Sequence, residues 1–149
     1  MRTVAVIGAG QMGSGITQQV AQCGMKVLLS DIDVALAEKA KANIDKALTR
    51  LVSREKLTPA DAEAVLARIT PVGDYAMFTE ADLIIEAATE KEEIKRKIFA
   101  AAGKVLREDA IMASNTSSIP ITRMATSSPD PKRFIGLHFF NPVPVMGLI

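Results

Sequence analysis

Two hydrophobic patterns alternate along this chain. Short apolar runs, several of them β-branched, are typical of strands that are buried on both faces, and they predict strands at 3–7, 26–29, 70–72, 82–87, 110–113 and 134–140. Helices are predicted where apolar residues recur at helical spacing or helix-favouring residues dominate, at 11–23, 34–54, 58–69, 91–106 and 119–125. Because strands and helices alternate, we expect an α/β fold with a doubly wound, mainly parallel sheet covered by helices on both faces.

Two of the predicted helices, 34–54 and 58–69, follow each other with no strand between them. Thr58-Pro59 marks the start of the second helix. Backbone N–H groups in the first turn of a helix have no partner, so proline, which lacks an N–H, is tolerated there. A crossover between parallel strands needs a single helix. The sequence therefore predicts a helical hairpin inserted after the second strand.

Three glycines follow the first predicted strand at the spacing G-x-G-x-x-G: Gly8, Gly10 and Gly13. In a dinucleotide-binding loop the first glycine allows a tight turn, the second lets the backbone approach a pyrophosphate, and the third lets helix and strand pack closely. The phosphates then meet free N–H groups at the helix N-terminus. A strand before the motif and a helix after it make it much more specific. We therefore expect a Rossmann-type nucleotide site that includes Gln11 and Met12; a purely structural turn is the alternative.

An acidic residue about 20 positions beyond the glycines completes this motif. Asp31 lies 18 positions after Gly13 and directly follows the second predicted strand. Its carboxylate can accept hydrogen bonds from both adenosine ribose hydroxyls and would repel a 2′-phosphate, which favours NAD over NADP as the cofactor. The alternative is that Asp31 caps the helix that follows.

Composition and charge narrow the class of protein. The 149 residues are enough for one domain with a sizeable core, and 48% hydrophobic with 23% charged residues is a globular balance. The net charge of +1 gives no reason to expect nucleic acid or a membrane as a partner, and no metal site is expected. The single cysteine, Cys23, fits a reducing compartment and is interpreted as a small core residue of the helix 11–23. The first apolar run stops at Gly8, which is short for an export signal, so we expect a cytoplasmic protein.

A reaction requires a group that exchanges a proton, and the chain has one histidine, His138. Imidazole titrates near neutral pH and is the natural general acid/base. His138 lies in the last predicted strand, toward its carboxyl end, the edge where ligands bind in such sheets. The polar cluster SNTSS at 114–118 follows the preceding strand, and Asn141 comes three residues after His138. Taken alone, a lone histidine is more often structural than catalytic, and Ser118 is equally suited to cap a helix.

Four segments together carry a resemblance to a known family. VAVIGAGQMGSGI, DLIIEAATE, SNTSS and LHFFNPVPVM, in this order and at these separations, resemble the N-terminal NAD-binding domain of the L-3-hydroxyacyl-CoA dehydrogenases. Within that family the bacterial 3-hydroxybutyryl-CoA dehydrogenases are the most similar, and the resemblance covers essentially all of residues 1–149. It implies an NAD-dependent oxidoreductase that interconverts an L-3-hydroxyacyl-CoA, 3-hydroxybutyryl-CoA by preference, and a 3-ketoacyl-CoA.

The resemblance also implies roles for individual residues. His138 would take the proton from the substrate 3-hydroxyl, Ser117 would hydrogen-bond the same oxygen near the nicotinamide, and Asn141 would help to hold this region. Glu90 and Lys95 match family positions that contact the cofactor; the alternative is an ordinary solvated helix start. The full implied cofactor-binding set is Gly8, Gly10, Gln11, Met12, Gly13, Asp31, Glu90, Lys95, Asn115 and Ser117.

The inserted hairpin has a counterpart in the family, where it borders the acyl-CoA site. Its basic residues Lys39, Lys46, Arg50 and Arg54 are candidates to meet coenzyme A phosphates, although a charged helix of this size is usually a solvated face. The family typically has lysine where this chain has Gly147.

The family pattern continues beyond Ile149 into an acidic residue that orients the histidine and into a C-terminal helical domain that closes the cleft and forms a homodimer. We therefore expect residues 1–149 to bind NAD but to turn over acyl-CoA poorly on their own. Two other functions are carried as alternatives. One is a dehydrogenase of 3-hydroxy acids free of CoA, and the other is a non-catalytic, NAD-binding or crystallin-like relative.

Overall fold

Within residues 1–146, which the computed structural model describes, six strands form one sheet. The strands are β1 (Thr3–Ile7), β2 (Lys26–Ser30), β3 (Ile69–Val72), β4 (Leu83–Glu86), β5 (Ile111–Ser114) and β6 (Phe134–Gly136). Their order is β3-β2-β1-β4-β5-β6, and every neighbouring pair is parallel. The predicted doubly wound sheet is confirmed, and the strand order reverses between β1 and β4, where such folds bind their ligands.

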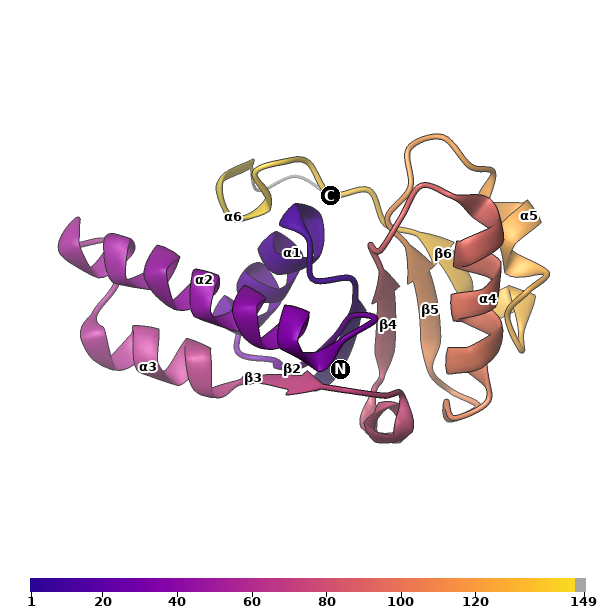
Figure 1. The fold of residues 1–149 in the computed structure, drawn as a ribbon, viewed down its shortest axis with the longest axis horizontal. Helices are drawn as coiled ribbons and strands as arrows, with labels where there is room; N and C mark the ends of the chain where they lie inside the picture. Colours follow the sequence, from indigo (N-terminus) through magenta and orange to yellow (C-terminus); the bar gives the residue numbers. More distant parts are fainter. Residues whose placement is uncertain (147–149) are drawn as a thin grey trace.

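Helices cover both faces of this sheet (Figure 1). They are α1 (Gln11–Gln22), α2 (Val34–Ser53), α3 (Pro59–Ala67), α4 (Glu92–Gly103), α5 (Ile121–Ala125) and α6 (Val143–Met146), with short 3₁₀ turns η1 (Ala76–Glu80) and η2 (Pro131–Arg133). The predicted hairpin is α2 and α3, which project to one side in Figure 1. Thr58 begins α3 by accepting a hydrogen bond from the Asp61 N–H at 3.1 Å. No helix in this part of the chain is long and apolar enough to cross a membrane.

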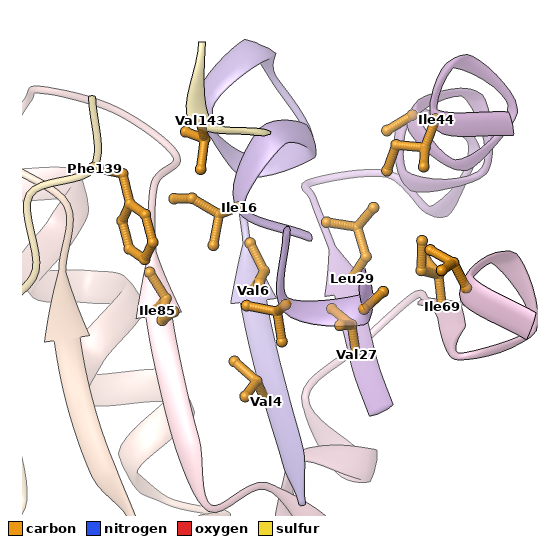
Figure 2. Packing of buried hydrophobic residues seen from close by; sticks show 14 of the residues in the cluster. Val4, Val6, Ile16, Val27, Leu29, Ile44, Ile69, Ile85, Phe139 and Val143 are labelled. Atoms are coloured by element: carbon orange, nitrogen blue, oxygen red, sulfur yellow. The ribbon is translucent and has the colours of Figure 1, made fainter. Parts of the chain in front are cut away.

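Two hydrophobic clusters lie on opposite faces of the sheet. Along β1, Val4 and Val6 belong to the cluster beneath α1, α2 and α3. Ala5 and Ile7 belong to the other cluster, which includes buried residues of α4 and α5. Both faces are therefore covered, which explains why the strands appear in the sequence as continuous apolar runs. Figure 2 shows the first cluster, with Val143 of α6 close to Ile16 of α1.

Two sequence-based predictions are corrected. Cys23 is exposed, because α1 ends at Gln22 and Gly24 turns the chain with φ of +92°. The last strand ends at Gly136 rather than at residue 140. The Leu137 N–H still bonds the Ser114 carbonyl, but the Phe139 N–H donates to the side chain of Asn115, so the backbone ladder does not continue.

Candidate functional site

The glycine loop has the geometry that a bound pyrophosphate requires. Gly8 has φ of +110°, and a Cβ there would lie 2.6 Å from the Ala87 carbonyl oxygen. A Cβ on Gly13 would collide with the Gly8 carbonyl, whereas a Cβ on Gly10 would meet nothing within 4 Å. The first glycine thus makes the turn, the third lets α1 pack on β1, and the second leaves open space above the backbone.

The N-terminus of α1 faces this space without a cap from the chain. Gly10 is the N-cap residue, no side chain caps it, and the first turn contains no acidic residue. Helix N-terminal N–H groups that lack partners bind anions favourably. Gly10 and Gln11 line two neighbouring cavities of about 500 and 260 Å³. The residues present therefore fit the phosphates of a dinucleotide.

Asp31 ties this loop to the end of β2. One carboxylate oxygen accepts the Ala9 N–H and the other accepts the Ile32 N–H, both at 2.7 Å. A carboxylate has about four acceptor positions, so both oxygens can still accept ribose hydroxyls. The helix α2 is capped instead by Asp33, which accepts the Ala35 N–H at 2.9 Å. The alternative that Asp31 is the cap is therefore wrong.

Tyr75 is an unpredicted aromatic neighbour of this edge. Burial raises the pKa of its phenol, and the negative charges of Asp31 and Glu86 raise that pKa further. The phenol therefore lies within electrostatic reach of both strand ends, those of β2 and β4. No local sequence signal distinguishes it, because its place depends on the fold.

His138, Ser117 and Asn141 line one cavity of about 230 Å³. Met12, Glu90 and Asn115 line the same cavity, and these three also line the 260 Å³ cavity beside the glycine loop. The fold thus brings together the predicted catalytic residues and several predicted cofactor residues from four distant segments of the chain.

Two aromatic neighbours fix the position of His138. The following side chain, Phe139, is buried near Ile85 (Figure 2), and its N–H donates to the Asn115 amide oxygen at 3.0 Å. The next, Phe140, stacks on the imidazole with ring centroids 4.9 Å apart and planes 15° apart. The imidazole itself is exposed, so a ligand can reach it.

Glu90 is held by two hydroxyls that sequence reasoning missed. Its Oε2 accepts from Thr116 Oγ1 at 3.0 Å and from Ser118 Oγ at 3.1 Å. Ser118 therefore does not cap α5, whose N-cap is Pro120. Within the SNTSS segment, Asn115 and Ser117 line the cavity. Thr116 and Ser118 orient Glu90.

Lys95 lies elsewhere than the resemblance implies. Its side chain is fully buried, and its Nζ lies 2.5 Å from Glu86 Oε2 and 3.4 Å from Ser114 Oγ. Because this side chain has no exposed surface, its position does not support a direct contact with the cofactor.

Lys39, Lys46 and Arg50 share one exposed face of α2, since they are spaced by seven and four positions. Arg54, the exposed C-cap residue of α2, follows four positions later. Arg50 lines the 500 Å³ cavity together with Asn141. Lys39, Lys46 and Arg54 do not line it. Gly147 lies outside the described residues.

A cavity of about 750 Å³ lies at the opposite edge of the sheet, where β5 begins, and contains none of the predicted site residues. Its Arg107 is already paired with Asp82 and Asp109, at 2.7 and 3.0 Å. Among residues 1–146, no three His, Cys, Asp or Glu side chains are grouped to hold a metal ion.

Comparisons with known proteins match nearly the whole chain. Residues 3–149 match the model of the family described as 3-hydroxyacyl-CoA dehydrogenase, NAD binding domain. A probable 3-hydroxybutyryl-CoA dehydrogenase of Deinococcus radiodurans is 46% identical over 144 residues, which are 97% of this chain and 51% of that protein. The 3-hydroxybutyryl-CoA dehydrogenase of Bradyrhizobium diazoefficiens is 45% identical over 149 residues, 100% of this chain and 51% of the relative.

Solved structures agree with the sequence matches. The crystal structure of (S)-3-hydroxybutyryl-CoA dehydrogenase from Ralstonia eutropha superposes with a TM-score of 0.95 at 46% identity, covering 98% of this chain and 52% of that chain. The chain thus spans about half the length of the curated relatives it matches.

Proposed function

Because this chain belongs to the 3-hydroxyacyl-CoA dehydrogenase NAD-binding domain family, we propose that it is the cofactor-binding domain of an enzyme that interconverts L-3-hydroxyacyl-CoA and 3-ketoacyl-CoA. 3-Hydroxybutyryl-CoA is the proposed substrate, since relatives that cover the whole chain are named for it. The observation that carries the proposal is the cavity in which His138, Ser117 and Asn141 meet residues of the nucleotide crevice.

In the proposed reaction, bound NAD supplies a nicotinamide ring that exchanges hydride with the substrate. His138 takes the proton of the 3-hydroxyl as that carbon becomes a carbonyl, and it returns the proton in the reverse direction. The Ser117 hydroxyl hydrogen-bonds the same oxygen, and Asn141 orients the group beside it. The buried side chain of Phe139 fixes the backbone next to His138, and the ring of Phe140 stacks on the imidazole. Together they hold the imidazole toward the cavity.

The remaining residues bind and select the cofactor. The α1 N-terminus and the open backbone at Gly10 accept the pyrophosphate, and Asp31 accepts the adenosine ribose hydroxyls. Glu90, oriented by its two hydroxyl donors, lines the crevice with Asn115.

Binding of coenzyme A is proposed at the exposed basic face of α2. Arg50 supports this best, because it lines a cavity that also contains Asn141 beside the catalytic histidine. Arg50→Glu and Arg54→Glu are expected to weaken acyl-CoA binding, whereas Lys97→Glu on α4 serves as an exposed control far from the hairpin. Unchanged acyl-CoA affinity in the two arginine variants would remove them from the site.

We also propose a cytoplasmic enzyme that forms a homodimer through a C-terminal domain outside residues 1–149. The support is the family resemblance together with relatives about twice as long as this chain.

Two measurements test the function. NADH is titrated into the chain and followed by its fluorescence, with NADPH as the comparison; saturable binding that favours NADH is expected. A protein containing this domain and the remaining family segment is then assayed for NADH oxidation with acetoacetyl-CoA. His138→Gln is expected to keep NADH affinity and to lose turnover. Absence of NADH binding would refute the cofactor assignment, and full turnover by the histidine variant would refute the catalytic one.

A further inference from the structure

Three polar side chains form a fully buried cluster beneath the nucleotide crevice. Glu86 ends β4, Ser114 ends β5, and Lys95 lies in the first half of α4; each has no exposed surface. Lys95 Nζ and Ser114 Oγ both contact Glu86 Oε2, at 2.5 and 3.0 Å. We call these three residues the buried triad.

The other oxygen of the Glu86 carboxylate accepts a hydrogen bond from a backbone N–H group. Glu86 Oε1 accepts the Ala88 N–H at 2.8 Å. This turn touches the glycine loop, since a Cβ on Gly8 would lie 2.7 Å from the Ala88 Cα. Ala88 also lines the 260 Å³ cavity with Gly10 and Glu90. The carboxylate therefore fixes the backbone at Ala88, which forms one wall of the crevice.

The buried triad joins the other walls as well. Ser114 directly precedes Asn115, which lines both cavities of the crevice. Lys95 links α4, which begins just after Glu90, to the ends of both strands. One carboxylate thus connects the three segments that present Ala88, Glu90 and Asn115 to the crevice.

Stability alone gives a weak reason for such a cluster. Two charges taken out of water lose hydration, and apolar residues of similar volume often stabilise a core equally well. The neighbouring strand residues Ile84 and Ile85 show that this strand accepts apolar side chains. Positional specificity is the property that a hydrogen-bonded ionic cluster provides and an apolar one does not.

We propose that Glu86 is a positioning residue for the cofactor: through Ala88, Lys95 and Ser114 it sets the spacing of the crevice walls that bind the dinucleotide. The inference rests on the proposed NAD-binding function. It also gives Lys95 a role that acts through Glu86, in place of a direct contact with the cofactor.

The test compares two double variants that remove both charges together. Glu86→Leu with Lys95→Met leaves the Ala88 N–H without its acceptor, whereas Glu86→Gln with Lys95→Met keeps an amide oxygen for it. The control is Lys26→Met with Glu80→Leu, an exposed pair at the amino end of β2 with a 2.8 Å contact. NADH affinity is measured by fluorescence well below each unfolding midpoint, and amide exchange of Ala88 is followed by NMR.

We expect the Leu/Met variant to bind NADH about tenfold more weakly and to exchange the Ala88 amide faster, because a buried donor has lost its partner. The Gln/Met variant should recover most of the affinity, and the control should match the wild type. Wild-type affinity in the Leu/Met variant, or an equal loss in both double variants, would overturn the proposal.

If the Leu/Met variant does not fold, Ser114→Ala provides the decisive measurement. It removes one hydroxyl from the buried triad and leaves both charges paired, and it should weaken NADH binding measurably; unchanged affinity would overturn the proposal. Failure of the wild type to bind NADH would instead refute the proposed function, so the two failures are distinguishable.

Discussion

A methyl group on Gly10 is expected to weaken NADH binding strongly while leaving the stability of the domain almost unchanged. The backbone at Gly10, with φ of −74° and ψ of −166°, is open to any residue, and a Cβ there meets nothing within 4 Å. Alanine lowers the entropy of the unfolded chain, which stabilises by about 0.4–1 kcal/mol. It is a poorer N-cap than glycine, which costs about 0.5–1 kcal/mol. The net change in unfolding free energy should therefore be within about 0.5 kcal/mol.

The effect on binding follows from the same geometry. The methyl group would occupy the space in which a phosphate approaches the N–H groups of α1. Losing one hydrogen bond to a charged group is worth about 1.5–3 kcal/mol, which corresponds to roughly tenfold to a hundredfold in the dissociation constant. Fluorescence titration with NADH measures the binding, and urea unfolding of the same samples measures the stability.

Two further glycines serve as controls. Gly13→Ala places its methyl against the Gly8 carbonyl, so it should destabilise by at least about 1–3 kcal/mol and disturb binding indirectly. Gly73→Ala meets only Val34 at an ordinary 3.6 Å, so it should leave NADH affinity unchanged and stabilise slightly, by about 0.4–1 kcal/mol, through the unfolded chain. Wild-type NADH affinity in Gly10→Ala would refute the placement of the pyrophosphate on this loop.

Three other predictions address selectivity, acid stability and the histidine. Asp31→Asn keeps an oxygen for the Ala9 N–H but removes the charge that repels a 2′-phosphate, so the NADPH to NADH affinity ratio should rise by about tenfold; an unchanged ratio would contradict the selectivity argument. The N–H groups of Arg2 and Thr3 and the Arg107 guanidinium hold the pKa of Asp82 well below its usual range. Asp82 therefore stabilises the fold fully above its unfolded pKa of about 3.9 and loses that contribution as pH falls further. The stability gap between wild type and Asp82→Asn in urea unfolding should be constant near neutrality and close below about pH 4; a gap independent of pH would contradict the pairing. Finally, Phe140→Leu should move the ring resonances of the single histidine downfield in NMR spectra, because the 4.9 Å stack shields them; unchanged resonances would show that the stack is absent.

Much of the fold could be predicted because its signals are local. The strand 3–7 and the helix start at Thr58-Pro59 coincide with β1 and with the cap of α3. The glycine loop could be predicted because its spacing encodes backbone geometry directly, as the turn at Gly8 shows. The family match confirms the resemblance that the four motifs carried.

The remaining features depend on contacts between distant residues. The hydroxyls that hold Glu90 come from positions 26 and 28 residues away, and no local pattern pairs them. The last strand was predicted too long because its apolar pattern continues to Phe140, whereas the capture of the Phe139 N–H by a side chain 24 residues away ends the ladder. The resemblance implied a cofactor contact for Lys95, with a solvated helix start as the alternative, and neither indicates its buried ion pair with Glu86 on β4.

The register of the sheet explains why these contacts converge. A single row of paired residues crosses the carboxyl edge: Ser30, Ile7, Glu86, Ser114 and Gly136. Residues paired in this way point to the same face, and the next residue of each strand points to the other. Glu86 and Ser114 therefore turn together toward α4 and Lys95. Ala87 and Leu137, which follow Glu86 and Gly136, turn to the α1 side and pack against the first cluster. A slip of one residue in β4 would exchange these directions. It would expose the Glu86 carboxylate to the crevice and bury Ala87 instead, so the site and the buried triad beneath it are two consequences of one register.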